Sequence, residues 1–548
     1  MNRSPLSLVP ASYGLNSAVR EQFRGSLPLM FGTAACVWLI ATVNVAGLLT
    51  ARLRQRSREI GLRLALGATS RRLIQGLLAE TVVAVMAGLL LGVAATLGIV
   101  RLLPTWIPSW TGLDVRISGS VLIAAGFTAI LTAIAITSIQ AFSLDRRQVL
   151  RHFTADRWRF RRRRRLSVST GLVIAQMALT LPVVIAAGLL GQTVYGLMNV
   201  HSGFDAGNLI QVHVEPVLAG YPLERNQAYY SEVLDRLRST PGMSDASVSS
   251  GGALSGFDGR ASVRYEGGVR DVRLNAVDDH YFRTLGIRIL AGRAFHATEA
   301  RHAQHVVVLN LALARQLFGA EHAAIGRLVT LIAGRESSER LVVGVVENTA
   351  DVDLRDRSTP AAYIPVGGSP LLVVHVRTTT EAASFIPLVR QTLTSVDAGV
   401  PVLGIGTIEG RRWHVLQRER LLSAFAAAVG WIALALCAVG LFSRVSYDVS
   451  TRLHEVGVRT ALGASRRQIA ALFLKSTAGI LLVGFGFGTG LALGATRLLE
   501  ASLYGVSASS AATYVASGCL ITAVAFLATV LPLRPAMSGT VAANLARE

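Results

Sequence analysis

One stretch of the sequence occurs twice in the chain. Residues 59–71 read Glu-Ile-Gly-Leu-Arg-Leu-Ala-Leu-Gly-Ala-Thr-Ser-Arg, and residues 455–467 read Glu-Val-Gly-Val-Arg-Thr-Ala-Leu-Gly-Ala-Ser-Arg-Arg. The match continues without a gap over 59–103 and 455–499, where 17 of 45 positions are identical. Chance does not produce such agreement, so the sequence predicts two homologous units in one chain.

Each copy of the repeat predicts a short amphipathic helix, over 52–66 in the first copy and 448–462 in the second. Charged residues recur there at intervals of four, three and four, which places them on one helical face. A glycine is expected to end each helix. The spacing leaves two roles open, a surface anchor in the membrane interface or a docking helix for a cytoplasmic partner. The charged residues and glycines concerned are Arg56, Glu59, Arg63, Gly67, Arg452, Glu455, Arg459 and Gly463.

The composition around the repeat is that of a membrane protein. Of the 548 residues, 51% are apolar and only 16% are charged. About 20 consecutive apolar residues are needed to cross a bilayer as a helix. Seven segments meet this requirement and are predicted to span the membrane: 28–50, 73–103, 119–142, 169–198, 421–446, 470–499 and 511–533.

The basic residues predict the orientation of these spans. The net charge is +21, yet residues 199–420 contain 23 arginines and 23 acidic residues, so the excess lies in the short loops. That location argues against a nucleic-acid binder and follows the positive-inside rule. The loops 51–72, 143–166 and 447–469 are therefore expected in the cytoplasm. The N-terminus and residues 199–420 are then outside, and the C-terminus is inside. The arginine run 161–165 is interpreted as holding the fourth span in place, with weak lipid contact.

Residues 199–420 predict an extracytoplasmic α+β domain of two lobes. Gly, Asp and Arg separate short apolar runs typical of strands from amphipathic runs typical of helices. The strands are expected at 209–214, 245–249, 261–265, 305–309, 341–347 and 371–377, and the helices at 224–239, 309–318 and 381–396.

No constellation of catalytic residues is evident in the sequence. The densest group of metal-ligand types is His296, Glu299, His302 and His305, for which a solvated loop is favoured over a zinc site. There is no Gly-x-Ser-x-Gly elbow and no Walker A motif, and the single lysine, Lys475, follows no glycine-rich turn. We therefore expect neither an enzyme nor a bound metal or cofactor.

The repeated motif resembles that of the FtsX/MacB-like family of ABC transporter permeases. Residues of the external segment also match that family's periplasmic core domain: Tyr281-Phe282, Gly292-Arg293, Asn310, Val343-Gly344-Val345-Val346 and Tyr363-x-Pro365. The duplicated layout is similar to the two-unit permeases common in acidobacteria. Relative to that pattern, a first span and a first periplasmic domain are missing, and 1–27 resembles only the tail of such a domain.

The resemblance implies a domain layout. Residues 28–142 would form a first FtsX-like membrane unit of three spans, followed by a basic cytoplasmic linker at 143–168. A transmembrane helix at 169–198 would lead into a MacB-like periplasmic core domain at 199–420. Residues 421–548 would form the second membrane unit.

The resemblance also implies a function, that of a permease subunit in an ABC-type export or mechanotransmission complex of the bacterial inner membrane. A separate cytoplasmic ABC ATPase would hydrolyse ATP and move the periplasmic domain through two docking helices, 52–66 and 448–462. The candidate docking residues would be the charged residues and glycines of these helices named above. Membrane lipid and a periplasmic protein are the other partners considered. The alternative is an ATPase-independent scaffold or sensor that binds an envelope partner through its periplasmic domain.

Overall fold

The computed structural model describes residues 27–66, 69–102, 118–143, 168–254, 259–301, 305–334, 336–350, 354–355, 359–367, 372–500 and 503–538. The predicted tail at 1–27 and linker at 143–168 lie outside the described residues except for their end residues. Gly67 and His302 also lie outside them. The chain divides into two compact units, one of Met1–Thr193 with Leu421–Glu548 and one of Val194–Arg420. Each unit is described by itself below.

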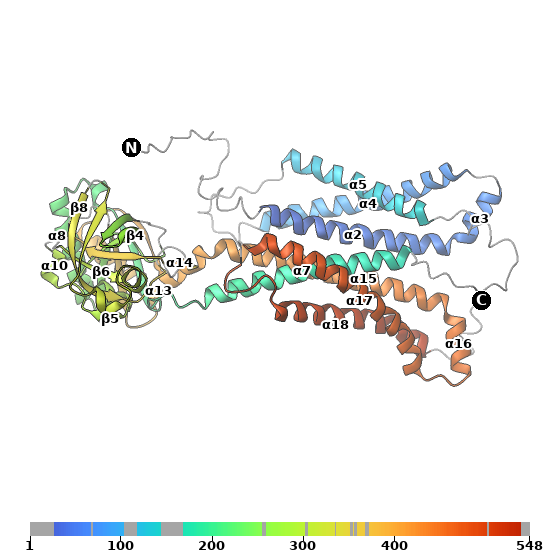
Figure 1. Cartoon of the computed structure of the whole chain (residues 1–548). Helices are drawn as coiled ribbons and strands as arrows, with labels where there is room; N and C mark the ends of the chain where they lie inside the picture. Colours follow the sequence, from blue (N-terminus) through green and yellow to red (C-terminus); the bar gives the residue numbers. More distant parts are fainter. Residues whose placement is uncertain are drawn as a thin grey trace. The chain divides into compact units, whose positions relative to one another are not determined.

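The first unit is a bundle of long apolar helices (Figure 1). Among the described residues, seven helices are long and apolar enough to cross a membrane, which confirms the seven predicted spans. They are α2 (Leu27–Gln55), α4 (Ser70–Leu102), α5 (Gly119–Ser143), α7 (Val168–Met198), α15 (Gln417–Thr451), α17 (Arg466–Leu499) and α18 (Ala511–Ser538).

Helix α7 lies at the centre of this unit. Of its most apolar stretch 67% is buried, whereas the corresponding share of α4 is 0%. Met177, Leu181 and Ile185 of α7 pack into one hydrophobic cluster with residues of α15, α17 and α18. Since lipid is as apolar as these side chains, the contacts are selected by close packing and not by escape from water.

Helix α2 joins the first three spans to this core. Ile40 of α2 is fully buried and packs with Val183 of α7 and with Val429 and Ala433 of α15. Two further short helices follow directly on spans, α3 (Ser57–Ala65) after α2 and α16 (Leu453–Ala461) after α15. Figure 1 shows both short helices at the same end of the helix bundle.

The second unit is an α+β domain built on one connected sheet. Its strands are β1 (Leu209–Val214), β2 (Met243–Ser249), β3 (Arg260–Tyr265), β4 (Gly268–Val277), β5 (Ile289–Gly292), β6 (Val306–Asn310), β7 (Leu328–Ala333), β8 (Glu336–Val346), β9 (Ala361–Pro365), β10 (Val373–Thr378) and β11 (Val402–Thr407). Its helices are η4 (Pro216–Ala219), α8 (Leu223–Ser239), α9 (Tyr281–Leu285), α10 (Ala297–Arg301), α11 (Leu311–Phe318), α12 (Glu321–Ala324), α13 (Ala382–Val396) and α14 (Ile408–Val415).

The strand order divides the sheet into two parts. Strands β11, β1, β10 and β2 pair in antiparallel order, and β2 then pairs with β4. From β4 the path runs through β3, β7, β8, β6 and β9, and β9 pairs back onto β4 in parallel. The second part is thus a closed ring of six strands, which leaves its members without open edges.

Each part of the sheet has its own hydrophobic core, as the predicted two lobes require. In the open part, α8 and α13 cover the sheet. Tyr230 and Leu237 of α8 and Val389 of α13 are buried between these helices and the strands. In the closed part, Val263, Leu309 and Leu313 belong to a separate cluster that includes α11. Both periodicities in the sequence, two for the strands and 3.6 for the helices, serve these cores.

The six predicted strands and three predicted helices of this domain all form, with ends that differ from the predicted ones by at most five residues. The sequence analysis did not name β4, β5, β7, β9 or β11. Strand β11 illustrates the reason, because Gly404 and Gly406 give it the composition of a loop. It is a strand because it pairs along β1, from Ile210 opposite Thr407 to Val214 opposite Val402. That pairing is a tertiary contact that local propensity does not contain.

A buried histidine lies in the middle of β10. The side chain of His375 is completely buried, its Nε2 lies 2.8 Å from Ser249 Oγ, and its ring meets Tyr281 edge to face. Burial, together with the smaller effect of the nearby charges of His213 and Arg411, lowers the pKa of His375 to about 3. The neutral imidazole is therefore the form that the folded domain accepts.

Candidate functional site

The two short helices α3 and α16 have the same design. Each has nine residues, a glutamate in its first turn and an arginine in its last turn. Acidic residues at the start of a helix and basic residues at its end oppose the helix dipole favourably. In α3, Arg63 Nη2 lies 2.5 Å from Glu59 Oε1, and in α16 Arg459 Nη2 lies 2.7 Å from Glu455 Oε1.

These ion pairs lie on the surface. All four side chains remain between 45% and 61% exposed. Exposed pairs of this kind contribute about 0.3–0.5 kcal/mol to a helix, so they do not explain the fold. What they provide is a fixed arrangement of one negative and one positive group on each short helix.

The predicted continuous helix over 52–66 is wrong, and so is its counterpart over 448–462. Helix α2 ends at Gln55 and α15 ends at Thr451, and each short helix begins two residues later. The turn at Arg56 separates the last turn of the span from α3, so the predicted charged stripe does not run along one helix. Arg56 instead reaches Glu80 of α4, with Nη1 and Oε1 2.8 Å apart.

Gly463 ends α16 as predicted. Its φ is +90°, a left-handed conformation that favours glycine, and its N–H donates to the carbonyl of Thr460 at 3.0 Å. The next helix starts at once with a capping box, in which Ser465 N–H donates to Gln468 Oε1 and Gln468 N–H donates to Ser465 Oγ. Gly67, its counterpart in the repeat, lies outside the described residues.

Each short helix has an exposed apolar pair that the sequence did not reveal, one residue on the helix and one directly after its end. Leu62 and Leu66 are 55% and 85% exposed, and their counterparts Val458 and Leu462 are 41% and 83% exposed. The inward-facing residues Ile60 and Val456 are buried. Both pairs recur at the same shift of 396 residues, but the repeat does not say that they are exposed. Each short helix, with the residue after it, therefore presents two apolar side chains beside an ion pair.

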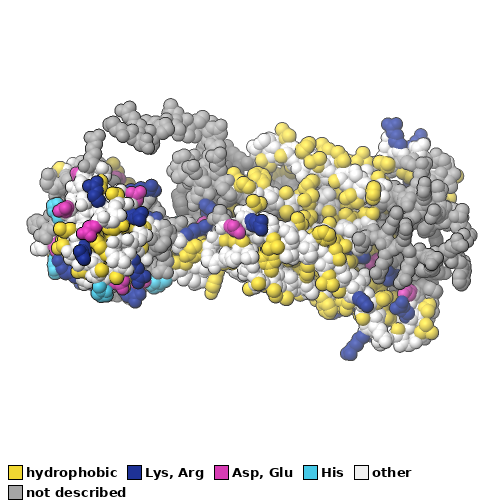
Figure 2. Space-filling view, in the orientation of Figure 1, with side chains coloured by type: hydrophobic (Ala, Val, Ile, Leu, Met, Phe, Trp, Pro, Cys, Tyr) yellow, Lys and Arg dark blue, Asp and Glu magenta, His cyan; other side chains and the backbone are white. Residues whose placement is uncertain are grey.

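A groove of about 400 Å³ lies beside α3. Four arginines and two glutamates contribute charged groups to its lining, so its net charge is positive. These residues are Arg52, Arg56, Glu59, Arg63, Arg72 and Glu80. Figure 2 shows hydrophobic side chains over the visible face of the membrane helices and basic side chains near the end that carries α3 and α16.

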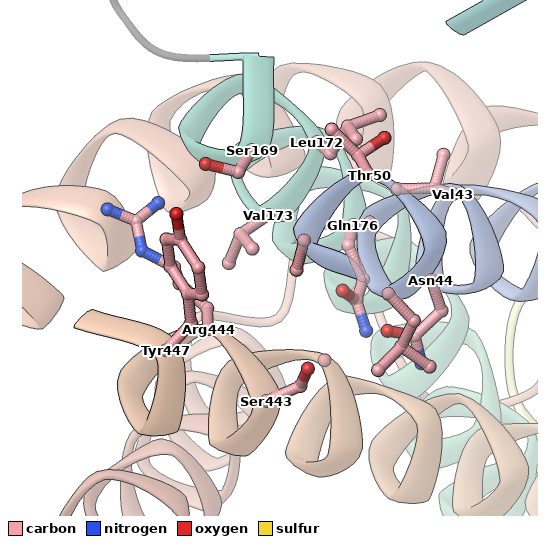
Figure 3. A pocket seen from close by; sticks show the side chains of 14 residues that line it. Val43, Asn44, Thr50, Ser169, Leu172, Val173, Gln176, Ser443, Arg444 and Tyr447 are labelled. Carbon is pink, nitrogen blue, oxygen red and sulfur yellow. The ribbon is translucent and has the colours of Figure 1, made fainter. Parts of the chain in front are cut away.

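Within the bundle, two amides share one backbone carbonyl. Asn44 Nδ2 of α2 and Gln176 Nε2 of α7 both donate to the carbonyl oxygen of Leu436 in α15, at 2.7 and 2.8 Å. A Cβ at Gly440 would lie 2.3 Å from Asn44 Oδ1 and 2.5 Å from Gln176 Oε1. Figure 3 shows both amides at the wall of a small cavity of about 30 Å³, which the three helices line. Glycine at 440 thus makes room for a polar junction of three spans.

The histidine-rich segment of the external domain has no zinc-site geometry among its described residues. Glu299 is engaged by Arg293, with Nη1–Oε2 and Nη2–Oε1 distances of 2.7 and 2.8 Å. The hydrogen bonds from Arg293 are the largest cause that holds the pKa of Glu299 below its usual value. No group of three or more His, Cys, Asp or Glu side chains suited to a metal occurs in the part of the chain that the structure describes.

The fold and these sites define a class: a multi-pass membrane permease with an α+β extracytoplasmic domain. Two family models match the chain and together cover most of it. The MacB-like periplasmic core domain matches residues 170–398. The FtsX-like permease C-terminal domain matches two segments, 31–148 and 427–541. The chain belongs to the FtsX/MacB-like ABC transporter permeases, proteins of the inner membrane.

The individual proteins that the chain resembles share about a quarter of the aligned residues with it. The chain is 26% identical over 254 residues to a macrolide export ATP-binding/permease protein MacB of Rhodopseudomonas palustris, covering 44% of this chain and 38% of that protein. It is 22% identical over 300 residues to a probable syringafactin export ATP-binding/permease protein of Pseudomonas syringae, covering 54% and 42%. The chain thus spans less than half the length of these relatives.

Solved structures of periplasmic regions are also similar. The crystal structure of the periplasmic region of MacB from Actinobacillus actinomycetemcomitans covers 39% of this chain and 94% of its own, with 14% identity and a TM-score of 0.28. The assignment of the chain to its family rests on the two family models and the sequence relatives.

Proposed function

We propose that this permease couples a cytoplasmic ABC ATPase to movement of its extracytoplasmic domain, with α3 and α16 as the two docking helices. The observation that carries the proposal is the matched pair of short helices, each with an exposed glutamate–arginine pair and two exposed apolar residues. A surface anchor would use the apolar residues and the arginine, but an exposed glutamate adds nothing to binding an anionic lipid surface. A partner's groove is recognised by apolar contact together with paired charges.

The connection of each short helix to its span supports coupling. A single-residue turn at Arg56 or Arg452 separates each docking helix from the span before it. Helix α15 has 35 residues, about 50 Å at the usual rise of an α-helix, and its first four residues belong to the extracytoplasmic unit. A force applied at α16 would therefore reach that domain along one continuous helix.

The proposal places α3, α16 and the C-terminus in the cytoplasm and the unit Val194–Arg420 in the periplasm. The distribution of basic residues supports this orientation. Relatives are named as a macrolide export protein and as a probable syringafactin export protein. In line with these names, we propose export as the process that this chain serves.

The test is retention of an ATP-binding subunit by the full chain. The chain is purified from native membranes in mild detergent and treated with azido-ATP, which labels any co-purified ATPase. The double variant Glu59→Arg plus Glu455→Arg should lose at least about ten-fold of the label, because each substitution replaces an ion pair at the contact by two positive charges. A ten-fold loss corresponds to about 1.4 kcal/mol of binding free energy. Glu232→Arg is the matched control, since Glu232 forms the same kind of pair with Arg236 in the extracytoplasmic domain.

Two results would contradict the coupling function. If the wild-type chain retains no labelled subunit under crosslinking, an ATPase-independent scaffold is the better description. If the Glu232→Arg control loses as much label as the double variant, the loss reflects damaged protein and the short helices are not the docking site.

A further inference from the structure

The two membrane units pack their last two helices in the same way. In the first membrane unit, residues 28–142, Thr81 of α4 donates to Gln140 of α5 at 3.2 Å. In the second membrane unit, residues 421–548, the counterpart of Thr81 is Thr477 of α17, which accepts from Thr529 of α18 at 3.3 Å. All four side chains are buried or engaged between the two helices. The units can therefore be compared position by position along α4 and α17.

The two membrane units differ on one face of α4 and α17, the face that α7 covers in the second membrane unit. A Cβ on Gly484 of α17 would lie 2.6 Å from Met177 Cβ, and one on Gly488 would lie 3.1 Å from Leu181 Cβ. The stripe continues through Ala492 and Thr496, which are also buried. Glycine at 484 and 488 is what allows α7 to approach this closely.

The same face of α4 has no helix against it in the described structure. Around the counterparts Gly88 and Gly92, no atom lies within 4 Å of an added Cβ, and both residues are exposed, as is Thr96. A repeated glycine need not be covered, since Gly98 and Gly494 are open in both units. The difference is thus confined to the positions that meet α7.

Helix α2 provides a second, independent observation about this uncovered side of the first membrane unit. The shift of 396 places Val45 of α2 opposite Leu441 of α15. Leu441 is 1% exposed and belongs to the cluster formed with α7, whereas Val45 is 36% exposed. On both helices of the first membrane unit, positions are therefore exposed whose counterparts are buried in the cluster that contains α7.

From this we infer that the α2–α4 face of the first unit is a docking site for a transmembrane helix of a second protein, with the side-chain pattern of α7. Such a helix is apolar and carries Met- or Leu-sized side chains four residues apart, with a small residue beside them, as Met177, Ala178 and Leu181 do. The larger side chains would fill the hollows over Gly88 and Gly92.

A second copy of this chain is a poorer occupant. Its α7 is the helix with the required pattern, yet Met177, Ile185 and Leu189 are fully buried within their own unit. Withdrawing them would leave cavities, each costing about 2–5 kcal/mol for a large apolar side chain. Lipid would also cover the face, but flexible chains gain little from a stripe of small residues, which favours a rigid helix.

The first experiment uses a defined probe, a synthetic peptide with the sequence of residues 168–198 and Leu181→Cys. The full chain, with Cys36, Cys437 and Cys519 replaced by alanine, carries Gly92→Cys and is reconstituted in lipid nanodiscs. Disulfide formation with the peptide should exceed that of Leu90→Cys, on the opposite side of α4, by at least about five-fold. The chain carrying both Gly488→Cys and Leu181→Cys is the positive control, because a Cβ at 488 would lie 3.1 Å from that of residue 181.

The second experiment asks for the occupant in native membranes. The photoreactive residue p-benzoylphenylalanine is placed at Ala84, on the glycine face, or at Leu90 as the control. An adduct at 84 whose crosslinked segment, mapped by mass spectrometry, is an apolar helix of another protein supports the inference. Equal peptide capture at 92 and 90, adducts with lipid alone, or adducts between two copies of this chain would overturn it.

Discussion

The two membrane units share 17 of 45 aligned residues, but identical residues in them have different surroundings. Gly484 and Gly488 are covered by α7, whereas Gly88 and Gly92 are open. Thr81 and Thr477 are buried in both units, because each faces a helix of its own unit. The difference teaches that a repeat conserves the helix and its shape, while the neighbouring helix determines which residues become core.

The largest expected effect follows from this difference. Gly484→Leu should reduce the free energy of unfolding by about 2–3 kcal/mol, since its Cβ alone would overlap Met177. Gly88→Leu is the matched variant and should have little effect on the purified chain. Thermal unfolding in detergent, followed by intrinsic fluorescence, measures both. Equal destabilisation by the two variants would mean that the glycines are equivalent and would remove the basis of the comparison.

A pH experiment separates unfolding of the extracytoplasmic domain from that of the membrane units. The folded pKa of His375 is about 3 and its ordinary value is 6.5, so between these values the unfolded chain binds a proton that the folded chain does not. The titration of His375 should therefore lower the free energy of unfolding by about 1.4 kcal/mol per pH unit as the pH drops below 6.5, in addition to the contribution of His213, whose folded pKa is about 4. His375→Gln, which keeps a hydrogen-bonding group near Ser249, should remove this part of the slope. An unchanged slope would contradict the assignment.

The junction between the units should give a smaller effect. Gly440→Ala would force Asn44 and Gln176 away from the carbonyl of Leu436, and interhelical hydrogen bonds in membranes contribute about 1–2 kcal/mol. We expect a loss of that order in thermal unfolding. Gly479→Ala is the control, because nothing lies within 4 Å of its added Cβ. A control variant as unstable as Gly440→Ala would show that glycine in these helices matters for another reason.

The smallest effect is expected at a contact that only one unit has. Glu80→Ser gives the first unit the residue that the second has at this position, Ser476, and removes the ion pair with Arg56. Because both side chains are more than half exposed, thermal unfolding should remain unchanged within error. A clear loss of stability would show that Arg56–Glu80 holds α3 in place and that the units differ at their short helices too.

Much of the fold could be predicted because its signals are local. The seven spans follow from apolar length, and β1 was placed at its observed bounds by its apolar residues alone. The docking residues Glu59, Arg63, Glu455 and Arg459 were found by spacing, and the structure pairs them as the spacing indicates. Their role in docking remains a prediction.

What could not be predicted depends on contacts between distant segments. The turn at Arg56 interrupts a charge pattern that reads as one helix, and its ion pair involves Glu80, 24 residues away. The exposure of Leu62 and Leu66 could not be read from the sequence, because an apolar residue on a short helix is equally consistent with burial. The uncovered face of α4 required the comparison with α17 in the structure, since the sequence has glycine at the same two positions of both helices, 88 and 92 in α4 and 484 and 488 in α17.

The shared carbonyl of Leu436 has a consequence for inheritance. Position 440 must lack a side chain only as long as Asn44 and Gln176 keep their amides, so these three positions form one heritable trait spread over three helices. A descendant that gains a methyl group at 440 would tolerate it best after shortening both amides. Lineages should therefore not combine a side chain at 440 with both amides, and a hybrid gene joining the amide at 44 from one type to a side chain at 440 from the other should be counter-selected.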